Sequence, residues 1–137
     1  MSIPVAERLA DADAAVRRLA VMDLPYGDED DIVPLLLPML ADADAGVRTE
    51  AVRALEGLEE PEVVRALAQC LLDADAGVRK AAGEVLGELK LAPSADAMLP
   101  MLDEHHPAEA RAMAFRAVRA LRDRKSTRLN SSHRCIS

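Results

Sequence analysis

One nine-residue segment occurs three times at a fixed interval, and this feature constrains the fold more than any other. It reads Leu-Leu-Asp-Ala-Asp-Ala-Gly-Val-Arg at residues 71–79, and close copies stand at residues 40–48 and 9–17. The interval between copies is 31 residues each time. A unit repeated at such a period is one supersecondary piece, which buries its apolar face only against its neighbours. We therefore expect a stack of repeated units.

Helix signals recur at the same place in each copy. An aspartate stands three residues before each valine of the Val-Arg pair, where its carboxylate can cap a helix and meet the positive end of the helix dipole. These aspartates are Asp13, Asp44 and Asp75. Apolar residues then follow at helical spacing, and Pro- and Gly-containing turns separate them from a second apolar helix. The sequence predicts an all-α solenoid of antiparallel helical hairpins, with about three full repeats and partial ends.

The repeats divide the chain into an array over residues 1–122 and a different segment over residues 123–137. We expect units near residues 10–40, 41–71 and 72–102, and a partial unit at 103–122. In the partial unit, Glu104 falls at the position of Asp73, with one residue inserted before Arg111. Because the array begins and stops within a unit, we expect apolar positions to face water at both ends, including those of Val118 and Leu121.

Residues 123–137 break with the composition before them. They contain Arg124, Lys125, Arg128 and Arg134 and have no helical apolar stripe. Over eleven consecutive residues, from 123 to 133, the segment resembles a sequencing-library adapter translated in frame. We interpret residues 123–137 as a non-native or disordered tail, in which case the array is a fragment of a longer protein. The alternative is a native basic tail for an acidic partner.

Composition argues against several classes of partner. The chain carries a net charge of −7, and its only aromatic residues are Tyr26 and Phe115. An acidic protein without aromatic platforms is poorly suited to nucleic acid or to anionic membranes. The longest apolar run, residues 32–40, is too short to span a bilayer, and two cysteines make no disulfide framework. We expect a soluble cytoplasmic protein.

The repeated pattern Leu-x-Asp-x-Asp-x-x-Val-Arg-x-x-Ala-x-x-x-Leu resembles the HEAT-like repeat of the phycobilisome-lyase type, an α-solenoid family, from residue 3 to about residue 122. The resemblance implies a ladder in which turn aspartates and the arginines after valine join neighbouring repeats. The implied ladder residues are Asp11, Arg17, Asp42, Arg48, Asp73 and Arg79. The fold hosts many functions, so the resemblance defines architecture better than activity.

The resemblance also implies that the Val-Arg helices line a concave surface whose exposed positions bind a partner. Those positions are Arg18, Leu19, Met22, Tyr26, Thr49, Glu50, Arg53, Lys80, Glu84, Glu88, Met113 and Arg116. Leu19, Met22 and Tyr26 have two interpretations. Leu19 and Met22 either cover the end of a truncated core or form, together with Tyr26, an exposed apolar anchor for a partner.

Few residues suggest chemistry. Acidic residues 28–31 could hold a cation, but carboxylates before a helix are also what the helix dipole favours. Residues 104–109 contain two histidines and two glutamates, which we interpret as a turn and cap rather than a metal site. Cys70 lies on the second apolar helix of its unit, beside Leu71, with nothing basic spaced to activate it, so we expect a buried thiol. We predict no catalytic residue, metal or cofactor.

Two functions remain open. The first is a protein–protein interaction scaffold or regulatory binding module, which grips an unidentified protein on the concave face and is not an enzyme. The second is a phycobilisome-lyase-like enzyme or chaperone subunit acting on a chromophore-bearing client, for which the aromatic and convergent polar groups of a tetrapyrrole pocket are missing. We expect no nucleic-acid or membrane partner, and self-association through the uncapped ends of the array.

Overall fold

The structure, a computed structural model, describes the backbone of residues 3–136 and the side chains of residues 3–123. Within these limits it is all-helical and contains no strand, which confirms the predicted fold class. The α-helices are α1 (Val5–Leu9), α2 (Ala14–Asp23), α3 (Val33–Leu36), α4 (Ala45–Ala54), α5 (Pro61–Gln69), α6 (Ala76–Gly87), α7 (Pro93–Met98) and α8 (Ala108–Ile136). Short 3-10 helices are η1 (Leu24–Tyr26), η2 (Leu37–Ala41), η3 (Cys70–Leu72) and η4 (Leu99–Leu102).

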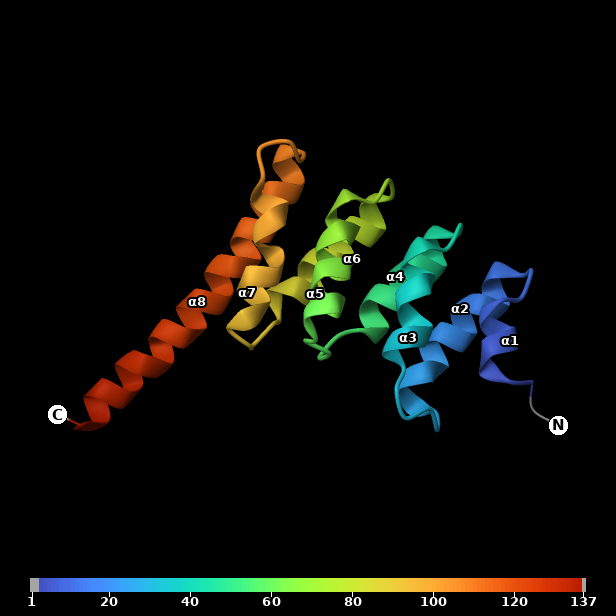
Figure 1. Cartoon of the computed structure of the whole chain (residues 1–137), viewed down its shortest axis with the longest axis horizontal. Helices are drawn as coiled ribbons and strands as arrows, with labels where there is room; N and C mark the ends of the chain where they lie inside the picture. Colours follow the sequence, from blue (N-terminus) through green and yellow to red (C-terminus); the bar gives the residue numbers. More distant parts are fainter. Residues whose placement is uncertain (1–2, 137) are drawn as a thin grey trace.

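The helices form four hairpins that stack in chain order (Figure 1). Each hairpin pairs one even-numbered helix with the shorter odd-numbered helix before it. Helices α2, α4, α6 and α8 pack successively against one another as one row, and α5 packs against α7 in the other row. This arrangement is the predicted solenoid of antiparallel hairpins.

The three predicted capping aspartates begin helices as expected. The side chain of Asp13 accepts a hydrogen bond from the amide of Ala15 at 2.9 Å. Asp44 and Asp75 accept from amides three residues ahead, at 3.0 and 3.1 Å. The aspartate two residues earlier accepts the amide of each capping residue, at 2.8 to 2.9 Å. The Asp-x-Asp turn therefore satisfies backbone donors on both sides of each helix start.

The core runs along the stack instead of gathering at one centre. Val47, Ala51 and Leu55 of the second hairpin are fully buried, and their counterparts in α6 are equally buried. The small alanine in this stripe lets neighbouring helices approach closely. Between α4 and α5 the chain turns through Gly57, whose φ of 86° is a left-handed conformation that favours glycine.

The prediction of exposed stripe positions at the last helix is wrong for two residues. Val118 and Leu121 are 5% and 4% exposed. The repeat pattern predicted this helix as the first half of an incomplete hairpin. In the structure α8 pairs with the helix that precedes it, so α7 and η4 cover the side expected to be bare.

The fourth hairpin also differs in register from the prediction. Asp73 and Asp103 each directly follow a 3-10 helix, so Asp103, and not Glu104, is the counterpart of Asp73. The interval from this aspartate to the ladder arginine is six residues to Arg79 but eight residues to Arg111. The last turn is therefore two residues longer than the others, where one inserted residue was expected.

Helix α8 continues to Ile136 and extends along its own axis beyond the packed hairpins (Figure 1). This continuation differs from the prediction of a non-native or disordered tail over residues 123–137. Because residues 123–137 contain neither proline nor glycine, nothing in their backbone stops the helix. The side chains from residue 124 onward lie outside the described part, and the adapter interpretation stays a prediction.

Candidate functional site

Two of the predicted ladder contacts join neighbouring hairpins with the same geometry. Arg17 donates from Nε to Oδ2 of Asp42 at 2.9 Å and from Nη2 to Oδ1 at 3.0 Å. Arg48 binds Asp73 through the same atoms at the same distances. The remaining Nη1 of each arginine donates to backbone carbonyls of the turn before its own helix. Each arginine therefore ties its own turn to the next one.

The ladder changes the ionisation of its members. Partial burial alone would raise the pKa of Asp42, but hydrogen bonds from Arg17 and from the Asp44 amide outweigh burial and lower that pKa. The hydrogen bond to Asp42 raises the pKa of Arg17, as the bond to Asp73 does for Arg48. The side chains of Arg17 and Asp42 are 15% and 10% exposed. These contacts are structural and leave little surface for a partner.

The third ladder contact is missing. Arg79 Nε is buried without a hydrogen-bond partner in the described part of the chain, and it lies 3.9 Å from Glu109 Oε1. Asp103 is held instead by His105, whose backbone amide and ring Nδ1 lie 2.8 and 2.6 Å from Oδ1. These two hydrogen bonds lower the pKa of Asp103. At the opposite end of the array, the carboxylate of Asp11 accepts the Asp13 amide but receives no arginine from the described residues.

Several predicted binding residues on the row of even-numbered helices are paired with one another. Arg18 Nη2 of α2 lies 3.5 Å from Glu50 Oε1 of α4. Arg53 Nη1 of α4 lies 4.0 Å from Glu84 Oε2 of α6. Such exposed pairs contribute about 0–1 kcal/mol each. Among the other predicted positions, half-buried Thr49 bonds back to the Ala45 carbonyl, and exposed Glu88 follows the end of α6.

A groove of about 550 Å³ lies between α6 and α8. It contains four of the predicted binding residues together with small residues that the sequence analysis did not select. The lining residues are Ala76, Lys80, Gly83, Glu84, Gly87, Glu109, Met113, Arg116, Ala117 and Ala120. A Cβ on Gly83 would lie 2.5 Å from Met113 Cε, so the end of the Met113 side chain occupies the space that a side chain at residue 83 would fill.

The charges around this groove are not all compensated. Glu84 faces Arg53, and Glu109 faces Arg79. Lys80 and Arg116, both exposed, form no ion pair among the described residues. The groove therefore combines a floor of glycine, alanine and methionine with two uncompensated cations, in a protein whose net charge is −7.

The predicted apolar patch on the first hairpin faces solvent. Leu19, Met22 and Tyr26 are 59%, 41% and 90% exposed. All three lie at the surface, and both interpretations of Leu19 and Met22 stay open, because residues at the uncovered end of a stack are exposed as well. Isolated exposed apolar residues are common, but three within eight residues form a candidate contact surface.

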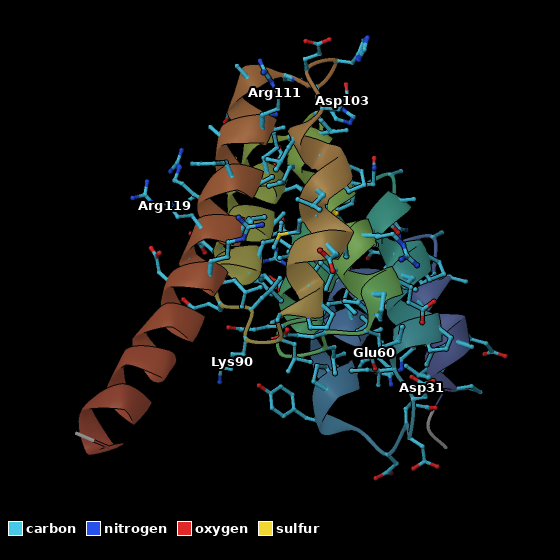
Figure 2. The ribbon with its side chains drawn as sticks, turned by 60° about the vertical axis from the view of Figure 1, so that its left-hand side comes forward. Asp31, Glu60, Lys90, Asp103, Arg111 and Arg119 are labelled. Carbon is cyan, nitrogen blue, oxygen red and sulfur yellow. The ribbon has the colours of Figure 1, made fainter. Side chains whose placement is uncertain are left out.

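Sequence reasoning missed one link between hairpins. Glu59, in the turn before α5, accepts hydrogen bonds from the amides of Lys90 and Leu91 at 2.6 and 2.8 Å and from Ser94 Oγ at 2.9 Å. This link lies at the opposite end of the hairpins from the arginine ladder, as the positions of Lys90 and Asp103 show in Figure 2. A glutamate in a polar turn gives no sequence signal of such a long-range role.

The chemical candidates do not assemble into a site. No cluster of three or more potential metal ligands occurs among the described residues, including the segments 28–31 and 104–109. The predicted burial of Cys70 is confirmed, and burial raises the pKa of its thiol to about 11. A thiol with so high a pKa carries little thiolate at neutral pH. No described helix is both long and apolar enough to cross a membrane.

The fold and its surface define a class of protein. It is a stack of helical hairpins joined by arginine–aspartate contacts of the same geometry, and one row of helices is accessible along the stack. The family model for HEAT repeats matches residues 4–87 and, in a second register, residues 36–119. The chain therefore belongs to the HEAT repeat family. No curated protein matches this chain.

Proposed function

We propose that this protein is a protein–protein interaction scaffold or regulatory binding module, and that it acts without catalysis. HEAT repeats generally serve as interaction scaffolds, which supports the class of function. The observation that carries the proposal is the groove between α6 and α8, where Lys80 and Arg116 stand uncompensated beside an apolar floor. We place the binding surface on the row formed by α2, α4, α6 and α8, as the concave face of the solenoid.

The charges of the groove indicate the kind of partner. An extended or helical segment with an apolar side chain would bury it against Gly83, Gly87 and Met113, and a neighbouring aspartate or glutamate would meet Lys80 or Arg116. Electrostatic complementarity of this kind chiefly sets specificity and the association rate. The acidic remainder of the chain would repel the same segment elsewhere, which favours binding at the groove.

The remaining predicted residues have lesser parts in this proposal. Arg18, Glu50 and Arg53 are already engaged in ion pairs between helices, so a partner would have to compete with those pairs. The patch of Leu19, Met22 and Tyr26 belongs to the first hairpin, away from α6 and α8, and forms a separate contact surface. The buried free thiol of Cys70 is in keeping with a cytoplasmic protein.

The alternative of a phycobilisome-lyase-like enzyme or chaperone subunit finds no supporting observation. The described lining of the groove contains no aromatic residue against which a tetrapyrrole could stack.

Peptide binding tests the proposal directly. Fluorescence polarisation would compare labelled peptides that combine leucine with glutamate against peptides in which lysine replaces each glutamate. We expect the acidic set to bind the protein, and the double variant Lys80→Glu, Arg116→Glu to weaken binding by about ten-fold or more, since two favourable charge contacts become repulsive.

The matched control is Arg65→Glu, which reverses an exposed charge on α5 in the other row. It should leave binding unchanged, and circular dichroism should show the same helicity for all variants. Equal losses from the control and the groove variant would overturn the assignment of the face. Equal binding of basic and acidic peptides would overturn the assigned partner.

A further inference from the structure

The last hairpin exposes a large aromatic residue at a position that is buried in the first two hairpins. Phe115 is the fourth residue after Arg111, and it is 55% exposed. The fourth residues after Arg17 and Arg48 are Val21 and Val52, and both are fully buried. Leu99, on the shorter half of the same hairpin, is 43% exposed. The outer face of α8 thus carries the apolar surface of a repeat interface without its partner.

The first hairpin exposes the complementary position. In the interface between α6 and α8, Gly83 faces Met113. Gly83 is the fourth residue after Arg79, and Met113 is the second residue after Arg111. The second residue after Arg17 is Leu19, which is 59% exposed, whereas the corresponding Ala81 is 1% exposed. Phe115 and Leu19 therefore occupy the two positions that contact each other in an interface between neighbouring hairpins.

The polar part of the repeat interface is divided between the two ends in the same way. In each complete ladder contact, an arginine binds the turn aspartate of the following hairpin. Arg111 occupies the arginine register in the last hairpin, and among the described residues its side chain bonds only to the His106 carbonyl of its own turn, through Nε. Asp11 occupies the aspartate register in the first hairpin, and its carboxylate receives no arginine among the described residues. One end offers a cation and the other an anion at matching positions.

We propose that copies of this chain associate head to tail, with α8 of one copy packed against α2 of the next. Phe115 would pack on Leu19, and Arg111 would bind Asp11, which reproduces between copies the interface that already joins hairpins within the chain. A second copy is the occupant because a single chain carries both complementary halves of the interface. The continuation of α8 to Ile136 runs along the helix axis, and Arg119 projects away from the stack (Figure 2), so the outer face over residues 108–121 stays accessible.

The proposed interface is heterologous, because two different faces of the chain meet in it. A face that binds a different face on the next copy does not close on itself after two copies, so assembly continues with rising concentration. The proposal does not depend on the groove between α6 and α8, which lies on the inner side of α8.

Sedimentation velocity of the full chain in reducing buffer, from micromolar to millimolar concentration, tests the proposal. We expect the mean mass to rise beyond that of a dimer. Phe115→Glu and Leu19→Glu should each reduce the association constant by about ten-fold or more, because each places an uncompensated carboxylate against an apolar side chain. Both residues are exposed in the monomer, so the variants should fold, as circular dichroism would verify.

An equimolar mixture of the two variants gives the decisive result. Phe115→Glu retains a functional first hairpin, and Leu19→Glu retains a functional last hairpin, so the mixture should form a one-to-one dimer and nothing larger. A wild-type chain that stays monomeric throughout, a mixture that does not associate, or single variants that associate as well as wild type would each overturn the proposal. The groove variant Lys80→Glu, Arg116→Glu should associate like wild type, which separates this test from that of the proposed function.

Discussion

Arg48 binds Asp73 in a bidentate contact whose two distances, 2.9 and 3.0 Å, equal those between Arg17 and Asp42 one repeat earlier. The residue separation is 25 in both cases. The repeat period of the sequence thus places the same arginine–aspartate contact between successive hairpins. These contacts hold the row of even-numbered helices in register and account for the regular part of the stack.

Replacing Arg48 with alanine should destabilise the fold more than replacing Arg53. Arg48→Ala removes two hydrogen bonds to Asp73 and two to backbone carbonyls, and it leaves the largely buried carboxylate of Asp73 without its cation, at a cost of about 1–3 kcal/mol. Arg53 is 55% exposed and lies 4.0 Å from its partner, so its loss should cost about 0–1 kcal/mol. Urea denaturation of both variants measures the difference, and equal midpoints would contradict the assigned roles.

Asp42 should make the fold sensitive to acid. Its pKa is lowered in the folded state, so its contribution to stability is present above the unfolded pKa, near about 4, and is lost as the pH falls through the folded value. Asp42→Asn should therefore be less stable than wild type at pH 7, and the difference should shrink below about pH 4. Thermal unfolding across pH 3 to 7, with Glu56→Gln as an exposed control, checks this; a constant difference would count against the linkage.

The hydrogen bonds of Glu59 should contribute more to the free energy of unfolding than an exposed charge does. Glu59→Ala removes a carboxylate that accepts two backbone amides and the buried hydroxyl of Ser94, so we expect a loss of about 1–3 kcal/mol. The neighbouring Glu60 is exposed and its side chain makes no capping bond, so Glu60→Ala serves as a matched control with little effect. Chemical denaturation should separate the two; a control loss as large as that of Glu59 would refute the proposed link.

Two glycines should respond to alanine with opposite signs. A Cβ on Gly87, the last residue of α6, meets nothing within 4 Å, so Gly87→Ala should stabilise the helix by about 0.5–1 kcal/mol. Gly57 has open space as well but a φ of 86°, so Gly57→Ala should destabilise by about 1 kcal/mol. Melting temperatures that move in the same direction would show that backbone conformation does not dominate at these positions.

Local features of the fold were predictable because their causes are local. The caps made by Asp13, Asp44 and Asp75 depend on residues two or three positions away, and the sequence contains all of them. The identity of the ladder residues followed from the family resemblance, and two contacts form among them, Arg17–Asp42 and Arg48–Asp73. Arg79 makes no such contact with Asp103, because the last turn is longer and His105 occupies Asp103, an outcome that depends on three-dimensional register.

The candidate groove was only partly predictable. Lys80, Glu84, Met113 and Arg116 were selected as exposed helix positions, but their charges alone do not show which of them are already paired. The replacement of a buried valine by Gly83 at the same repeat position is the signal that could have located the groove, because a missing side chain leaves space between neighbouring helices. The pairing of α8 with α7, which buries Val118, was missed because each Val-Arg helix was paired with the helix that follows it instead of the helix that precedes it.

The absence of an Arg79–Asp103 contact distinguishes one junction from the others. Arginine–aspartate pairs join the first two junctions at the Asp-x-Asp turns, whereas Glu59 joins the third junction at the opposite end of the hairpins (Figure 2). At the third junction Arg79 instead faces Glu109, which lines the α6–α8 groove together with Ala76. Within the described residues, the groove therefore lies at the junction that has no arginine–aspartate pair.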